Sequence, residues 1–130
     1  MLALDTNALI HFFKGMGRVK ERLLATPPAE VAIPSVVLYE LEIGIAQSRQ
    51  ASKRRTQLDE LVSVVTVLSF DASSAKRAAE VDTVLRRKGM PIGPLDTLIA
   101  GTALAHQATL VTHNTAEFQR VAGLKLVDWF

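Results

Sequence analysis

The sequence contains no cysteine. This absence excludes a disulfide-stapled scaffold, a cysteine nucleophile and a zinc site built from thiolates. It is compatible with an intracellular setting, and we expect the chain to be cytoplasmic. The sequence also has only a small excess of positive charge, with a formal net charge of +2 and an isoelectric point near 9.2. This mildly basic balance permits a nucleic-acid partner without requiring one.

Long hydrophobic runs are missing as well. The apolar stretch at residues 62–68 has seven residues, whereas crossing a bilayer needs about 20. Asp5 interrupts the apolar start of the chain too early for a secretory signal, so we expect neither a leader nor a membrane segment. No repeat, low-complexity tract or linker divides the chain, and its 130 residues suit one domain with a sizeable core. We therefore predict a single domain over residues 1–130.

The pattern that is present alternates short apolar segments with amphipathic ones. The apolar segments predict strands at 2–4, 30–34, 65–70, 109–112 and 124–130. Helical spacing predicts helices at 6–14, 18–26, 36–48, 50–64, 72–89, 93–107 and 115–122. Because the strands lack polar alternation, we expect a parallel sheet of about five strands that is buried on both faces of an α/β sandwich.

Several residues are expected to begin helices or to fill the core. Thr6 or Asn7 is a candidate N-cap for the first helix, and Ser35 and Asp71 are candidates for two later ones. Asp5 is an alternative cap for the first helix. The aromatic pair at residues 129–130 is expected in the core rather than on a base-stacking surface.

Three acids stand in apolar surroundings. Asp5 follows the first strand, Glu40 and Asp96 lie in predicted helices, and none has a lysine or arginine within four residues. The helical neighbours of Glu40 and Asp96 at three and four positions are apolar or small, and a lone charge there is costly unless compensated. A shared divalent cation would compensate all three. Periodicity does not choose between Glu40 and Glu42, since both faces are equally apolar.

Four blocks of the sequence resemble the PIN-domain ribonucleases, and among them the VapC-type toxins of bacterial toxin–antitoxin pairs. The blocks are LALDTNALI at 2–10, IPSVVLYELEIGI at 33–45, IGPLDTLIAGTALAH at 92–106 and TLVTHNTAEFQRVAGLKLVDW at 109–129. The resemblance implies a PIN-like three-layer α/β/α sandwich with a short, mainly parallel sheet of about five strands. It also implies a metal-dependent endoribonuclease that hydrolyses RNA, acts as a toxin, forms a homodimer and is covered at its acid pocket by a small antitoxin protein.

The resemblance assigns roles to individual residues. It implies that Asp5, Glu40 and Asp96 are catalytic acids that bind Mg²⁺ or Mn²⁺, and it prefers Glu40 to Glu42 through the spacing of residues 35–41. It places Asn114 at a fourth catalytic position, where the family often has an aspartate. That departure leaves a second metal ion open, with Glu117 as a possible substitute.

Neighbouring polar residues would support these acids. Thr6 and Asn7 could orient Asp5, and Thr112 could support a ligand. His113 adjoins the expected site. A basic run could hold RNA phosphates beside the acids or be ordinary solvated helix surface, and its members are Arg49, Lys53, Arg54 and Arg55.

Two other functions remain open from the sequence. Asn114 motivates a catalytically weak or inactive PIN-like module that binds RNA or a protein partner. A phosphatase-like enzyme with Asp5 as nucleophile is less favoured, because position 7 is asparagine where such enzymes usually carry a second acid. Metal-dependent cleavage of RNA separates the first alternative from the nuclease, and a trapped phospho-aspartate would support the second.

Overall fold

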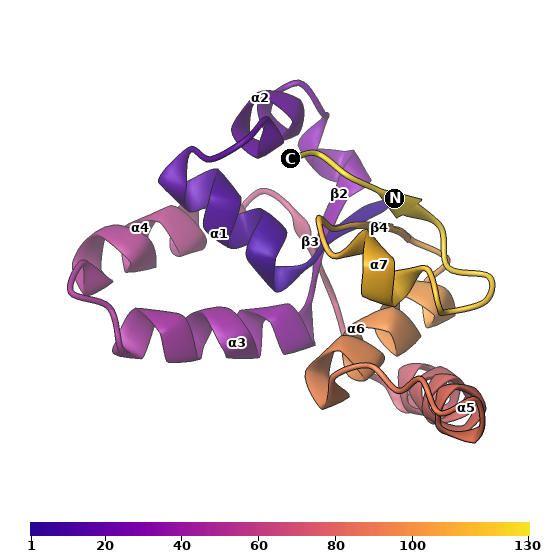
Figure 1. The fold of residues 1–130 in the computed structure, drawn as a ribbon. Coiled ribbons are helices and arrows are strands. Elements are labelled where there is room, and N and C mark those ends of the chain that lie inside the picture. Colours follow the sequence, from indigo (N-terminus) through magenta and orange to yellow (C-terminus); the bar gives the residue numbers. More distant parts are fainter.

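The computed structural model describes all 130 residues and contains one five-stranded, fully parallel sheet. The strand order is β3-β2-β1-β4-β5, so the first strand lies at the centre (Figure 1). The strands are β1 (Leu2–Leu4), β2 (Val31–Pro34), β3 (Thr66–Leu68), β4 (Thr109–Val111) and β5 (Leu126–Val127). The expected α/β class and the parallel sheet are confirmed.

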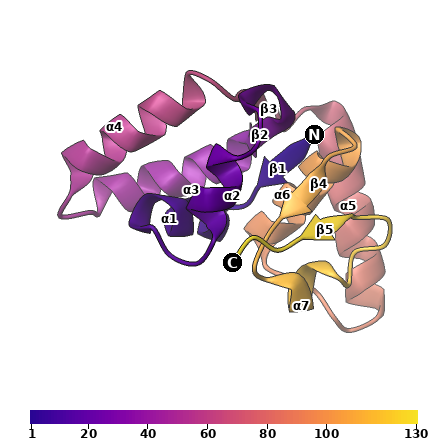
Figure 2. The ribbon, with the colours of Figure 1, turned by 90° about the horizontal axis from the view of Figure 1, so that it is seen from above.

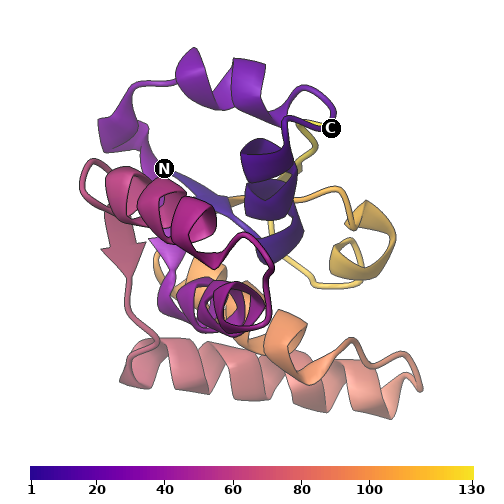
Figure 3. The ribbon, with the colours of Figure 1, turned by 90° about the vertical axis from the view of Figure 1, so that its left-hand side faces the viewer.

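Helices cover both faces of this sheet. They are α1 (Thr6–Lys14), α2 (Val19–Leu24), α3 (Ser35–Ala46), α4 (Ala51–Val62), α5 (Ala72–Arg87), α6 (Pro94–Ala105) and α7 (Thr115–Phe118), with a short 3₁₀ turn at Pro28–Glu30. Figure 3 shows α1 and α2 on one side of the sheet and α3, α5 and α6 on the other, which is the expected three-layer arrangement. None of these helices is long and apolar enough to cross a membrane.

The central strands form the middle of the hydrophobic core. Every residue of β2 is buried, and Ala3, Leu4, Leu110 and Val111 of β1 and β4 are fully or almost fully buried. The edge strand β3 differs, because Thr66 and Val67 are exposed and only Leu68 is buried. The prediction of strands buried on both faces is therefore right for the centre of the sheet and wrong for this edge, where no further strand or helix covers the side chains.

The helix N-termini correct two of the capping predictions. Asp5, and not Thr6 or Asn7, caps α1 by accepting a 2.8 Å hydrogen bond from the Ala8 amide. Ser35 is the first residue of α3 and not its cap. Its hydroxyl accepts from the Phe70 amide at 3.1 Å and so ties α3 to the loop after β3.

Asp71 behaves as predicted at the start of α5. Its carboxylate accepts a 2.9 Å hydrogen bond from the Ser74 amide. This helix packs closely on α6 (Figure 2), because Gly101 has no side chain and the backbone of Ala78 fits against it. A Cβ atom placed on Gly101 would lie only 2.6 Å from the Ala78 nitrogen. The close approach anchors α6, whose first turn carries Asp96.

Candidate active site

The candidate site lies where the carboxyl ends of the central strands meet. Asp5 directly follows β1, Thr112 directly follows β4, and the two segments are joined by a hydrogen bond from the Asp5 amide to the Val111 carbonyl at 3.1 Å. Asp5 is 4% exposed, and the Thr112 hydroxyl hydrogen-bonds its carboxylate. The backbone of two paired strands therefore fixes this carboxylate in a buried position.

Glu40 reaches the same region from the second turn of α3. The Thr6 hydroxyl donates a 2.7 Å hydrogen bond to its Oε1 atom, so the first helix orients the glutamate of the third. Glu42 points elsewhere and forms a bidentate pair with Arg55, with both N–O distances at 2.6 Å. The structure thus places Glu40 at the acid cluster and Glu42 in a surface ion pair, a distinction that periodicity could not make.

Asp96 and Glu117 complete the cluster from the first turn of α6 and from α7. The charge of Glu117 acts on Asp96 and raises its pKa, and Asn114 Nδ2 donates to Glu117 Oε2 at 2.8 Å. The backbone N–H of Asn114 donates to the Thr112 hydroxyl at 2.9 Å. Asn114 therefore positions Glu117, which sequence reasoning offered only as a substitute, and its spacing of three residues in a helical turn was the available signal.

The electrostatics of this acid cluster, defined as Asp5, Glu40, Asp96 and Glu117, are strongly unbalanced. Burial, together with the charges of Glu117, Glu40 and Asp5, raises the pKa of Asp96 to about 6. Burial also raises the pKa of Asp5, against the opposing effect of its hydrogen bonds. No lysine or arginine pairs with any member, because every ion pair of the molecule lies elsewhere. The site holds like charges that the protein itself does not neutralise.

The donor set fits a hard divalent cation, although the cage of three carboxylates expected from the sequence is not assembled. No three carboxylate or imidazole groups lie close enough together to hold one ion jointly. Magnesium usually takes one or two carboxylates directly and keeps several waters, so three direct ligands are not required. All donors in the cluster are oxygens, and the charge of Asp5 contributes to the raised pKa of Asp96.

The supporting residues divide into those that contact the cluster and those that do not. Thr6 contacts Glu40 and Thr112 contacts Asp5. Asn7 is exposed and makes no side-chain hydrogen bond to Asp5, so the prediction that Thr6 and Asn7 orient Asp5 is not seen.

The basic run at residues 49–55, which begins just before α4 and continues into it, is partly occupied by contacts within the protein. Arg55 pairs with Glu42, and Arg54 donates to the Phe13 carbonyl at 3.0 Å and to Gln57 at 2.8 Å. Arg49 and Lys53 form no ion pair. Lys53 instead lines a hollow of about 530 Å³ together with Lys14 and Lys20, which come from α1 and from α2.

Comparison with known proteins gives a consistent set of similarities. The PIN domain model matches residues 2–124. The chain is 37% identical to the tRNA(fMet)-specific endonuclease VapC of Shigella flexneri, over 97% of this chain and 96% of that protein. It is 39% identical over 99 residues to ribonuclease VapC2 of Rickettsia felis, with 76% of this chain and 74% of that protein covered.

Solved structures show the same similarity in three dimensions. VapBC2 from Rickettsia felis, bound to a DNA fragment from its promoter, matches with a TM-score of 0.91 and 34% identity, covering 99% of this chain and 98% of that chain. DNA-bound VapBC from Salmonella typhimurium also matches with a TM-score of 0.91, at 32% identity and with the same coverage.

Proposed function

This chain belongs to the PIN-domain family, within its VapC ribonucleases, and we propose that it is a Mg²⁺- or Mn²⁺-dependent endoribonuclease, the toxic component of a toxin–antitoxin pair. The observation that carries the proposal is the acid cluster at the carboxyl edge of the sheet, whose charges have no cationic partner in the protein. The four carboxylates repel one another, and this repulsion costs stability. A reaction that uses a metal ion bound by these acids would account for their presence at the site.

The residues of the cluster have separable tasks in this reaction. When bound, Mg²⁺ or Mn²⁺ would activate a water molecule and offset negative charge on the phosphodiester. Asp5, held by its cap hydrogen bond, and Asp96 would hold the ion, while Thr6 orients Glu40 at the same end of the sheet. Glu117, oriented by Asn114, would accept the proton that the attacking water loses. No side chain has to act as a covalent nucleophile.

Asn114 no longer favours an inactive binding module over an enzyme. It was the departure that motivated the alternative, since an amide adds no charge to the site. In the structure its amide nitrogen holds Glu117, and that carboxylate contributes the negative charge that an aspartate at position 114 would have supplied. The charge of the site is therefore kept by a neighbouring residue.

A hollow lined by three lysines is a better candidate for binding RNA phosphates than the whole basic run at residues 49–55. The lysine hollow, whose lining includes Lys14, Lys20 and Lys53 together with Phe12 and Phe13, has Glu60 as its single acidic residue. Lys14 lies nine residues after Asp5, which is about 13 Å along the α1 axis, so the hollow suits a phosphate some way from the one being cleaved. We propose that phosphates bind here and not at Arg55.

The salt dependence of RNA binding tests this assignment. Lys53→Ala is expected to lower the slope of log K against log salt by about 0.7, as one lost contact to a single-stranded phosphate does. Arg55→Ala is the matched control from the same helix and is expected to leave the slope unchanged, because its charge is already paired with Glu42. Equal changes in both variants would contradict the proposal.

A groove beside the acid cluster suits the antitoxin. It has a volume of about 290 Å³ and an apolar lining of Ile10, Phe13, Leu41 and Ile45, and its charged lining residues are Glu40, Lys14 and Arg54. An apolar segment that carries one arginine or lysine could fill the groove and place its cation among the carboxylates. We propose such a segment of a small antitoxin as the partner, and a homodimer of this chain as its assembly, which sedimentation of the purified chain tests.

A cleavage assay tests the enzymatic proposal directly. Purified chain with Mn²⁺ or Mg²⁺ is expected to cleave RNA, and Asp5→Asn and Asp96→Asn are expected to lower the rate by at least about 100-fold, which corresponds to about 3 kcal/mol in the barrier. Asp59→Asn, an exposed acid on α4, is the matched control and should retain full activity. If wild type, both site variants and the control all give the same background, the proposed function fails.

A further inference from the structure

A cluster of rings lies at the edge of the acid site and has no part in the mechanism described so far. Phe130 and His113 are stacked, with ring centroids 4.3 Å apart and ring planes inclined by 26°. His11 meets Phe130 edge-on at 4.7 Å, and His113 at 6.2 Å. The expectation that Phe130 lies in the core is wrong, because 43% of its surface is exposed, whereas the neighbouring Trp129 is buried as expected.

The stacked pair is held in place although it is exposed. The Phe130 amide donates to Asp128 Oδ1 at 2.8 Å, and its carbonyl accepts from the Arg18 amide at 3.1 Å. The His113 ring is fixed by a 2.9 Å hydrogen bond between its Nδ1 and Asp128 Oδ2. The Phe130 ring packs directly against Gly17, because a Cβ atom at this position would lie only 2.8 Å from the ring. Rings fixed in this way lose little conformational freedom when a ligand stacks on them.

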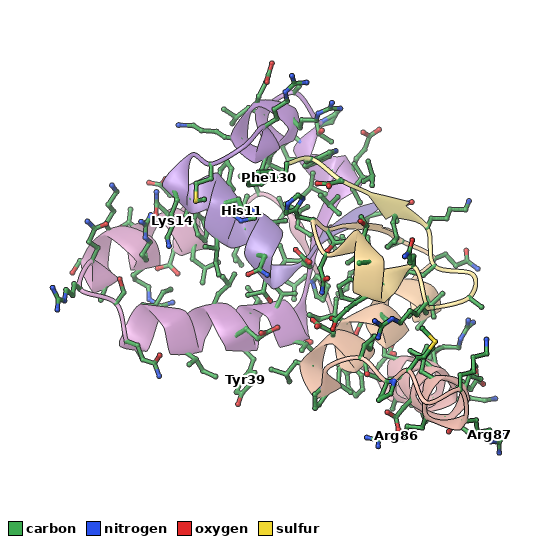
Figure 4. All side chains as sticks on the ribbon, in the orientation of Figure 1. His11, Lys14, Tyr39, Arg86, Arg87 and Phe130 are labelled. Atoms are coloured by element: carbon green, nitrogen blue, oxygen red, sulfur yellow. The ribbon has the colours of Figure 1, made fainter.

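The rings belong to segments that also carry residues of the acid cluster. His113 directly precedes Asn114, which holds Glu117, and His11 lies two turns into the helix that Asp5 caps. Figure 4 shows His11 and Phe130 side by side along α1, while Tyr39 points away from them on α3. Burial raises the pKa of Asp5, and the charge of His11, together with the hydrogen bonds of Asp5, acts in the opposite direction.

We propose that the exposed rings of Phe130 and His113 form a stacking platform for one nucleobase of single-stranded RNA, next to the phosphodiester that is cleaved. The proposal rests on the proposed function. An unstacked base presents a flat π face, and proteins bind single-stranded RNA by stacking such faces on Phe, Tyr, Trp and His rings. Because the two rings lie face to face, the platform offers an incoming group the area of one ring, and it is bordered by Asp128. It therefore suits one base better than an apolar peptide segment, for which the groove beside Glu40 offers several apolar side chains.

Fluorescence of 2-aminopurine tests the platform without any cleavage. Short single-stranded RNAs that carry this base at successive positions are bound to the wild-type protein in EDTA, and the position whose fluorescence is quenched is recorded. We expect quenching at one position beside the bond that is cleaved when Mn²⁺ is added. Phe130→Leu should abolish the quenching and weaken RNA binding by about 5- to 150-fold, and Phe130→Trp should restore both. Tyr39→Leu, which removes an exposed aromatic ring elsewhere, should change neither.

Each outcome of this experiment has a defined meaning. Thermal unfolding of Phe130→Leu establishes that the variant is folded, and the Trp variant keeps the test valid if the Leu variant is not. Quenching and affinity unchanged in a folded Phe130→Leu protein would overturn the platform, as would a loss of antitoxin binding with RNA binding intact. Wild-type protein that binds and quenches RNA but does not cleave it with any divalent ion would instead refute the proposed function and leave the platform standing.

Discussion

Neutralising Asp96 should make the metal-free protein more stable while it makes the enzyme inactive. Asp96 is half-buried and close to three other carboxylates, and burial and their charges together raise its pKa from 3.8 to about 6. At pH 8 its carboxyl group is therefore ionised. A change of this size corresponds to about 3 kcal/mol, and we reduce it to about 1.5 kcal/mol because solvent screens a half-exposed group. Asp96→Asn removes the charge and keeps the shape, so it should recover this free energy of unfolding.

The assay is thermal unfolding in EDTA at two pH values. At pH 8 Asp96→Asn should unfold roughly 5 °C above wild type. The contribution of Asp96 to stability is greatest below 3.8 and is lost as the pH rises through about 6, since its pKa is higher in the folded state. At pH 4.5 Asp96 is largely protonated in the folded protein but still largely ionised in the unfolded chain, so the advantage of the variant should fall to about one third of its value at pH 8. Added Mn²⁺ should also reduce the difference in unfolding temperature at pH 8, because it should stabilise the wild-type protein more than the Asp96→Asn variant.

Two results would refute this reasoning. The first is a variant no more stable than wild type at pH 8 in EDTA, which would mean that the carboxylates do not repel one another. The second is an equal gain at pH 8 and pH 4.5, which would assign the gain to packing and not to charge. Asp59→Asn serves as the control, because this exposed acid lies 3.6 Å from Arg55 and its removal should give no increase in stability.

Three further substitutions test packing and orientation. Gly101→Ala should destabilise the protein by about 1–3 kcal/mol in denaturant unfolding, since its Cβ would meet the Ala78 backbone; no loss would contradict the close approach of α5 and α6. Gly44→Ala, where a Cβ meets nothing within 4 Å, should instead stabilise helix α3 by about 0.5–1 kcal/mol in the same measurement. Thr6→Val should weaken Mn²⁺ binding measured by calorimetry about 10-fold through the loss of its hydrogen bond to Glu40, and Thr6→Ser should restore it.

The features predicted correctly from the sequence are those set by local patterns. Apolar segments without polar alternation indicate buried parallel strands, and this pattern correctly placed β1, β2 and β4. Asp71 was recognised as a cap because capping depends on neighbours three residues away. The exposed face of β3 was missed, since its residues are as apolar as those of a central strand and only the sheet order reveals that it lies at the edge.

The site depended on contacts between distant segments, which local patterns do not contain. Glu40 and Glu42 have equally apolar neighbours on α3, and the difference between them arises from Thr6 on α1 and Arg55 on α4. The same holds for Phe130, whose exposure follows from how the last segment crosses the loop at Gly17. Only the resemblance to a family supplied the choice of Glu40, because it carries information about three-dimensional neighbours that a single sequence lacks.

The arrangement of the acid cluster explains how a fold of this size can carry so much unbalanced charge. Asp5 follows the central strand, and its carboxylate is held by the Ala8 amide and by Thr112, which is itself fully buried. These hydrogen bonds keep the carboxylate in place without neutralising it, so repulsion raises the pKa of neighbouring groups instead of opening the structure. The free energy for this comes from the buried strands on which Asp5 and Thr112 stand. Under the proposed function, a metal ion or a cationic side chain of an antitoxin would relieve the repulsion from outside, and the two would compete for the same carboxylates.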